Sequence, residues 1–337
     1  MTLAWTLLLL AFPAGAQSAA ELAAAGVQHL EANRPVEAQA AFEQSLRKNP
    51  TEFEALSGMG FLSYSRDEFA EARRYLEKAV ALRPQSFQVR FLLGAALVRL
   101  NEPKAAIVHL RQAVTRNPGH RDARKLLAAQ YVETRQFREA AALLLPVVET
   151  PPFDEELHLL LIEARQTSGD STGAFALAAK AAERFPHSAQ VLAWLGFQLQ
   201  FAGRYDEAKS PLRRAIELDP AFPEPLHILG EVFLKEENYA QAATWLSQAA
   251  EKMPDDTETL LALGRALAES GDTPRSIQIL ERAAATAPKD ARVPLQLSRI
   301  YFRLGDETKA RQKAELSIQL RDANPNPIAP PAPLRSR

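Results

Sequence analysis

The sequence predicts an all-α protein built as a solenoid of helical hairpins, and three observations lead to this fold class. Apolar residues recur at helical spacing in short segments. A proline closes each pair of such segments, and the whole pattern repeats every 34 residues. A globular chain of 337 residues would suggest two domains, but the repeats favour one elongated array instead.

The repeat unit is clearest in residues 189–220. Leu192 and Leu199 fall on one face of a first helix. Residues 203–205 interrupt this helix, and a second apolar stripe then runs until Pro220 ends the unit. Two short amphipathic helices cannot bury both of their apolar edges against each other. Each hairpin must therefore be covered by a copy of itself on either side.

Three columns of residues fix the register of the repeats. Prolines recur at intervals of 34 residues as Pro50, Pro84, Pro118, Pro152, Pro186, Pro220, Pro254 and Pro288. Small residues form a column in the second helix, namely Ala38, Ala72, Ala106, Ala140, Ala174, Ala208, Ala242, Ser276 and Ala310. Glycines form a column in the first helix, namely Gly26, Gly60, Gly94, Gly196, Gly230 and Gly264. The facing small residues let the two helices of a hairpin approach closely, and each proline disfavours helix before it.

Two repeats depart from these columns. In the fifth repeat, Ile162 stands in the glycine column, and Ala178 stands where other repeats have leucine or phenylalanine. This exchange of a large and a small residue suggests a local change in the helix crossing. In the ninth repeat Ser298 replaces glycine, as is common in terminal repeats.

The spacing and the three columns resemble the tetratricopeptide repeat. They match in nine consecutive units from about Ala19 to Asp322. The resemblance implies that the hairpins coil into a right-handed superhelical solenoid. It also implies that the first helices line a concave groove, which binds extended or helical peptide segments of partner proteins. The family's clamp for chaperone C-termini is not expected, because the column of Val27, Phe61 and Phe197 holds no asparagine.

The chain is expected to have three parts. Residues 1–16 are predicted to be a signal peptide, because the apolar run Leu3–Phe12 is followed by small residues before Gln17. Residues 17–322 form the solenoid. Residues 323–337 form a proline-rich, disordered tail. The alternative for the N-terminus is a hydrophobic first helix that caps the array.

Composition and motifs exclude several classes of function. The chain has 40 basic and 41 acidic residues, so no bulk attraction to nucleic acid or to an anionic membrane is expected. It has no cysteine, which excludes thiolate zinc sites, disulfides and a thiol nucleophile. No apolar run approaches the roughly 20 residues of a membrane span.

No catalytic motif stands out either. The sequence has no HExxH motif, no GxSxG elbow and no glycine-rich phosphate loop. His158 occupies a column that holds leucine in several repeats, so we interpret it as a packed core histidine. The sequence therefore predicts a protein that is not an enzyme and has no catalytic site, no metal site and no cofactor.

The candidate partner-binding groove lies on the exposed face of the first helices. Its residues are Phe61, Tyr64, Phe91, Trp194, Phe197, Phe201, Arg265, Arg292, Arg299 and Arg303. The lining is expected to run from apolar, through acidic with aromatics, to basic. Two interpretations stay open for each part. The apolar residues either pack between neighbouring first helices or line a ligand groove, and the arginines either form a solvated face or bind an anion.

These observations predict a non-enzymatic protein–protein interaction scaffold, located in the bacterial periplasm or secreted. One alternative is a regulatory or docking subunit of an envelope enzyme or polysaccharide-export complex. Another is a cytosolic adaptor, if the N-terminus is not cleaved. The partners are expected to be proteins or peptides, with no nucleic acid and no membrane span. The C-terminal edge, where no further repeat covers Leu316 and Ile318, is a candidate surface for self-association.

Overall fold

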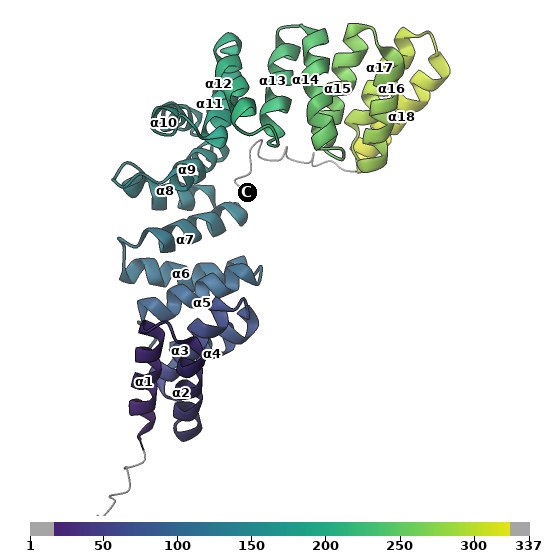
Figure 1. Cartoon of the computed structure of the whole chain (residues 1–337). Coiled ribbons are helices and arrows are strands. Elements are labelled where there is room, and N and C mark those ends of the chain that lie inside the picture. The colour runs from purple at the N-terminus through teal and green to yellow at the C-terminus, as the bar shows by residue number, and fades with distance from the viewer. Residues whose placement is uncertain (1–16, 324–337) are drawn as a thin grey trace, which may run out of the picture. The chain divides into compact units, whose positions relative to one another are not determined.

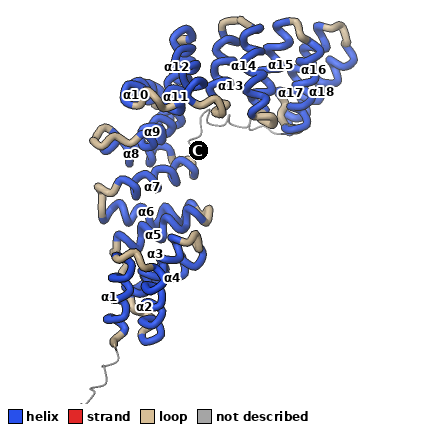
Figure 2. Tube along the Cα trace, viewed as in Figure 1, coloured by secondary structure: helices blue, strands red, loops and turns tan. Residues whose placement is uncertain are grey.

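A computed structural model describes residues 17–323, and all regular structure in this range is helical (Figures 1 and 2). The all-α prediction is therefore confirmed. The described residues divide into two compact units, residues 17–139 and 140–323. The predicted signal peptide and all but the first residue of the predicted tail lie outside the described residues.

The first unit is a stack of hairpins in which the first helices α1, α3 and α5 each pack on their own second helix and on the next first helix (Figure 1). Its helices are α1 (Ala19–Glu31), α2 (Pro35–Lys48), α3 (Phe53–Ser65), α4 (Phe69–Leu82), α5 (Phe87–Arg99), α6 (Pro103–Arg116) and α7 (Arg121–Glu133). The boundary between the units falls within α8 (Phe137–Val148).

The second unit repeats this arrangement from the remainder of α8 onward. Its further helices are α9 (Glu155–Ser168), α10 (Ser171–Arg184), α11 (Ala189–Phe201), α12 (Tyr205–Leu218), α13 (Glu224–Lys235), α14 (Tyr239–Lys252), α15 (Thr257–Ser270), α16 (Thr273–Thr286), α17 (Arg292–Arg303) and α18 (Glu307–Ala323). In Figure 1 the helices α13 to α18 stand side by side, and α18 lies at the end of the row.

A fourth column, which sequence analysis missed, makes the turn inside each hairpin. One residue there has a left-handed backbone, with φ between 55° and 95°, at every 34th position. These residues are Asn33, Asp67, Asn101, Arg135, Gly169, Gly203, Glu237, Gly271 and Gly305. Glycine, asparagine and aspartate tolerate this conformation best, so their recurrence is the signal that could have revealed the turn.

The glycine column lies directly against a large side chain of the second helix. A Cβ atom built on Gly196 would lie 2.4 Å from Leu212 Cγ, and one on Gly230 would lie 2.5 Å from Leu246 Cγ. Real Cβ atoms do not approach other carbons so closely, so only glycine fits at these positions. The predicted close approach of the two helices is confirmed.

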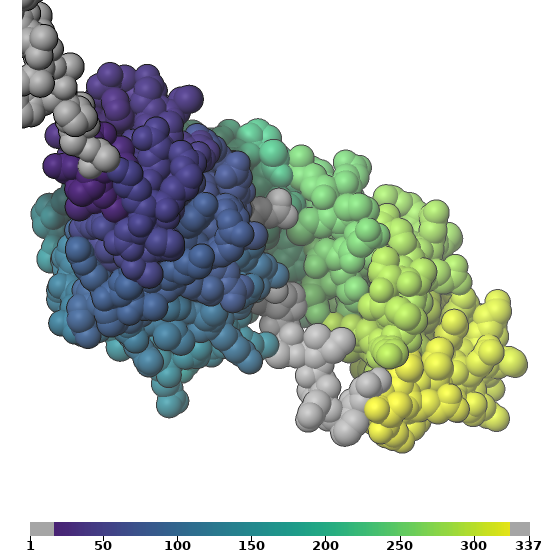
Figure 3. Space-filling model, turned by 90° about the horizontal axis from the view of Figure 1, so that it is seen from below, coloured from purple at the N-terminus to yellow at the C-terminus, as the bar shows by residue number. Residues whose placement is uncertain are grey.

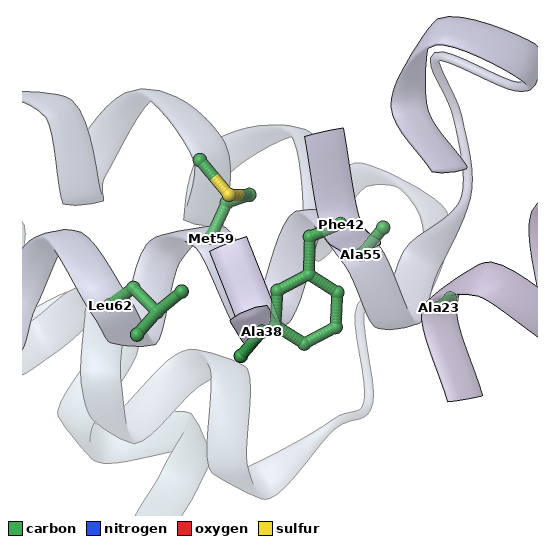
Figure 4. Packing of buried hydrophobic residues seen from close by; sticks show 6 residues of the cluster. All are labelled: Ala23, Ala38, Phe42, Ala55, Met59 and Leu62. Atoms are coloured by element: carbon green, nitrogen blue, oxygen red, sulfur yellow. The ribbon is translucent and has the colours of Figure 1, made fainter. Parts of the chain in front are cut away.

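The first hairpin, α1/α2, closes this seam with an aromatic ring in place of leucine. Phe42 is fully buried among Ala23, Ala38, Ala55, Met59 and Leu62 (Figure 4). Its ring also lies where Cβ atoms on two glycines would clash, Gly26 in α1 and Gly58 in α3.

The fifth repeat exchanges the large and the small residue of the seam. Ile162 in α9 and Ala178 in α10 are both fully buried. Since a first-helix residue of this column faces the second-helix residue 16 positions later in other hairpins, as Gly196 faces Leu212, we expect the larger residue to occupy the space that the smaller one leaves.

Candidate partner-binding surface

An exposed aromatic surface lies on the first helices of the first unit. Phe61 in α3 is 48% exposed, although it is a large apolar side chain. In α5 the rings of Phe87 and Phe91 stack with their centroids 5.9 Å apart and their planes within 3°. His120, at the start of α7, lies 4.8 Å from the first ring and 4.9 Å from the second. Tyr64 is half-buried, so the predicted aromatic residues of this unit all reach the surface.

The aromatic residues of the second unit differ from one another in burial. Phe201 in α11 is 62% exposed, and its ring lies 6.3 Å from that of Phe197. Trp194 is only 2% exposed and meets Phe197 edge-on, with centroids 5.7 Å apart. Trp194 therefore packs against Phe197 within the core and presents little surface to a partner.

Polar bonds link neighbouring first helices of the second unit. Gln200 Nε2 in α11 donates to Glu231 Oε2 in α13 at 2.8 Å. His227 Nδ1 in α13 lies 3.0 Å from Thr259 Oγ1 in α15. These bonds occupy part of the acidic middle of the predicted groove, because Glu231 already has a donor from the neighbouring hairpin.

Two of the four predicted arginines are held in ion pairs. Arg292 in α17 bonds Glu258 Oε1 and Asp290 Oδ2, both at 2.6 Å. Hydrogen bonds to Asp290 and Glu258 raise the pKa of this guanidinium. Burial alone would raise the pKa of the Asp290 carboxyl, but the bonds from Arg292 outweigh it and lower that pKa.

Arg303 forms a second such pair, with both of its terminal nitrogens on the carboxylate of Glu269 at 2.9 and 3.0 Å. In each case the glutamate stands 34 residues before the arginine, so the partners share a column in successive repeats. Sequence analysis missed both pairs, although opposite charges in one column are a readable signal.

The other two arginines remain available. Arg265 in α15 and Arg299 in α17 are exposed, and neither makes a hydrogen bond or ion pair with any residue of the range 17–323. Together with Arg303 they line a small cavity of about 80 Å³ between α15 and α17. This arrangement favours binding of an anionic group by two guanidinium groups.

The remaining site predictions concern chemistry other than partner binding. His158 is fully buried, with Nδ1 2.7 Å from Asp154 O and Nε2 3.2 Å from Arg184 Nη1. Burial lowers the pKa of this imidazole, and its interpretation as a core histidine is confirmed. Residues 17–323 contain no group of three or more His, Asp or Glu side chains placed to hold a metal. None of the helices in this range has the length and apolar character of a membrane span.

Sequence comparison identifies the family. A profile described as tetratricopeptide repeat matches residues 29–90, 97–161, 200–266, 233–293 and 267–315, and a second profile of the same description matches residues 62–121. The chain belongs to the tetratricopeptide repeat family. Proteins of this family bind protein or peptide partners and are generally non-enzymatic scaffolds. No curated protein sequence matches the chain.

Solved tetratricopeptide structures share the fold. The APC/C hetero-tetramer Cut9–Hcn1 matches 87% of this chain with a TM-score of 0.57 and 18% sequence identity. This chain covers only 57% of the matched chain. A tetratricopeptide repeat protein from Parabacteroides merdae matches 75% of this chain and 100% of its own, with a TM-score of 0.49 and 14% identity. YrrB, described as a tetratricopeptide protein with an unusual peptide-binding site, matches 56% of this chain and 96% of its own, with a TM-score of 0.46 and 20% identity.

Proposed function

We propose that this protein is an exported, non-enzymatic scaffold that binds segments of partner proteins on the exposed face of its first helices. The tetratricopeptide fold itself suggests a protein–protein interaction scaffold. The exposure of large aromatic side chains on this face, above all Phe61 and Phe201, supports this location for the site. Aromatic residues supply much of the affinity at protein interfaces, and exposed apolar patches mark such interfaces.

Photocrosslinking in the native host tests this surface. We replace Phe61 with the photoreactive residue p-benzoylphenylalanine, which keeps the aromatic ring. The matched control places the same residue at Val108 on the second helix α6, because Val108 is 44% exposed and Phe61 is 48% exposed. We expect a crosslinked partner from position 61 and none from position 108. Crosslinking to the same partner from position 108 alone would place the binding surface on the second helices and contradict the proposal.

Export is the second part of the proposal. The apolar run and the small residues before Gln17 support it. The start of α1 supports it too, because the helix has a complete cap after that point. Ser18 Oγ accepts from Glu21 N at 3.1 Å, and Glu21 Oε2 accepts from Ser18 N at 2.6 Å. This reciprocal capping box satisfies two N–H groups at the start of the helix, those of Ser18 and Glu21, without any residue before Gln17.

We therefore expect the mature protein to begin at or near Gln17 and to leave the cytoplasm. N-terminal sequencing of the protein from fractionated cells of the native host checks both statements. Recovery of the chain with Met1 in the cytoplasmic fraction would reject export and leave a cytosolic adaptor, without affecting the crosslinking result.

A further inference from the structure

The last hairpin contains an open cleft between α17 and α18. The cleft has a volume of about 710 Å³. It is lined by Ser298, Arg299, Phe302, Arg303, Glu307, Ala310, Arg311 and Ala314. These helices form the end of the second unit and carry the yellow atoms in Figure 3.

The cleft exists because the seam of this hairpin lacks its large side chain. In five of the preceding hairpins a glycine faces a leucine, as Gly264 faces Leu280, whose Cδ2 lies 2.6 Å from the place of a Cβ on that glycine. The corresponding residues of the last hairpin are Ser298 and Ala314. Ser298 Oγ bonds Ala310 O at 2.8 Å, and neither Ser298 nor Ala314 has the volume of the leucine. An apolar side chain of another molecule can occupy this place.

Arg311 belongs to a column whose basic members bind acidic residues of the following hairpin. Arg73 in this column bonds Glu102 at 2.8 Å, and Lys209 bonds Glu236 at 2.6 Å. Within residues 17–323 no hairpin follows Arg311, and Arg311 has no hydrogen bond or ion pair there. The chain itself therefore shows that a carboxylate satisfies a basic residue at this position.

The other charges of the cleft also favour an acidic occupant. Arg299 has no ion pair with any described residue, and Arg303 is already paired with Glu269. Glu307 is the only acidic side chain that lines the cleft. Arg299 and Arg311 thus leave positive charge next to an apolar opening, where opposite charge gives an interface its specificity.

Apolar side chains at the α17/α18 end of the second unit are exposed as well. Phe302 is 71% exposed and Ile318 is 48% exposed. By contrast, Ala250 in the column of Ile318 is 5% exposed, because the hairpin α15/α16 follows it. This end of the unit therefore resembles a hairpin surface from which the next first helix has been removed.

The N-terminal helix of a second copy of the chain does not offer the matching surface. Val293 and Ile300 in α17 are 0% and 3% exposed. In α1, the first helix that a second copy would present, Glu21 and Gln28 stand in these two columns, and both are exposed. A helix with polar residues at these positions has no apolar side chain to fill the cleft.

We propose that the cleft between α17 and α18 binds an acidic segment of a partner protein that carries a bulky apolar side chain. The apolar side chain fills the space beside Ser298 and Ala314, and carboxylates pair with Arg299 and Arg311. The inference rests on the proposed scaffold function, since it gives that function a second, chemically defined surface.

Selection from a displayed library of random dodecapeptides on the full chain tests this inference. We expect enriched peptides to combine aspartate or glutamate with a large apolar residue. Binding of a synthetic copy of an enriched peptide is then measured by fluorescence anisotropy. One variant, Ser298→Gly with Ala314→Leu, restores the glycine–leucine pair and fills the cleft. A second, Arg299→Glu with Arg311→Glu, reverses the exposed charges without touching the core.

Each variant should weaken binding about 10-fold or more. The charge-matched control is Arg111→Glu with Arg213→Glu, on the exposed surfaces of α6 and α12, and it should change the affinity less than about 2-fold. Enrichment of peptides without acidic residues, or full affinity in both cleft variants, would overturn the inference. If only Phe201→Ala weakened binding, the scaffold proposal would stand and the cleft would not be the site. Self-association that Ser298→Gly with Ala314→Leu abolishes would instead identify a second copy as the occupant.

Discussion

Replacing Gly196 with isoleucine should destabilise the α11/α12 hairpin by about 1–3 kcal/mol. A Cβ at this position would lie 2.4 Å from Leu212 Cγ and 2.5 Å from its Cδ2, so the two helices must separate or the leucine must leave its rotamer. Local hydrogen exchange of α11 and α12 measures the effect better than a single melting curve. Repeat arrays can open hairpin by hairpin, so a global two-state free energy is not assured.

The fifth repeat supplies a compensating control. Ile162 and Ala178 are both fully buried and show that a large residue on the first helix is tolerated when the second helix carries alanine. The double substitution Gly196→Ile with Leu212→Ala copies this pair. We expect the double variant to lose about 0.5–3 kcal/mol less stability than the sum of the losses in the two single variants. Strictly additive effects would show that the two residues do not share one space.

Truncation of Phe42 to alanine should lower the stability of the first unit by about 3–5 kcal/mol. Phe42 is fully buried and is the largest such side chain among residues 17–323. Its removal leaves a cavity between α1, α2 and α3, because its ring touches the faces of Gly26 and Gly58. Urea unfolding combined with hydrogen exchange of α1 to α4 measures the loss.

Two variants separate the volume of this ring from its shape. Phe42→Leu should cost less than Phe42→Ala, since leucine fills this column in neighbouring hairpins. Gly58→Ala should be destabilising, because its Cβ would lie 2.3 Å from Phe42 Cε2. The same change should be tolerated together with Phe42→Leu. A Gly58→Ala protein as stable as wild type would show that the ring does not need this glycine.

The repeating part of the fold could be predicted from the sequence, because each hairpin meets the same neighbours in the same way. The glycine and alanine columns indicate a close helix crossing that recurs in most of the hairpins. Gly58 could not be found in this manner. It lies outside the columns and is required only because Phe42 is larger than the leucine used elsewhere. The turn column has a sequence signal, because most of its residues are glycine, asparagine or aspartate. Arg135 and Glu237 interrupt that signal, since they adopt positive φ without being one of these residue types.

The helix face on which the candidate residues lie was predictable from the sequence, but their accessibility was not. Helical periodicity identifies the face on which an aromatic residue lies, whereas its exposure depends on the side chains of the neighbouring hairpin. Trp194 and Phe201 were both predicted to line the groove, yet Trp194 is 2% exposed and Phe201 is 62% exposed. Likewise, Arg299 and Arg303 differ because only Arg303 has a glutamate in its own column one repeat earlier. Whether these residues bind a partner is a prediction that the crosslinking and peptide experiments test.

The two ends of the array differ in how readily they could accept an additional repeat. A hairpin added before α1 would bury Glu21 and Gln28, which are polar and exposed, so it would leave their polar groups without water. A hairpin added after α18 would cover Ile318 and could supply a carboxylate to Arg311. Duplication of a repeat can therefore lengthen the chain at its carboxyl-terminal side with little change to existing residues. Extension at the other side would first require a new surface on α1.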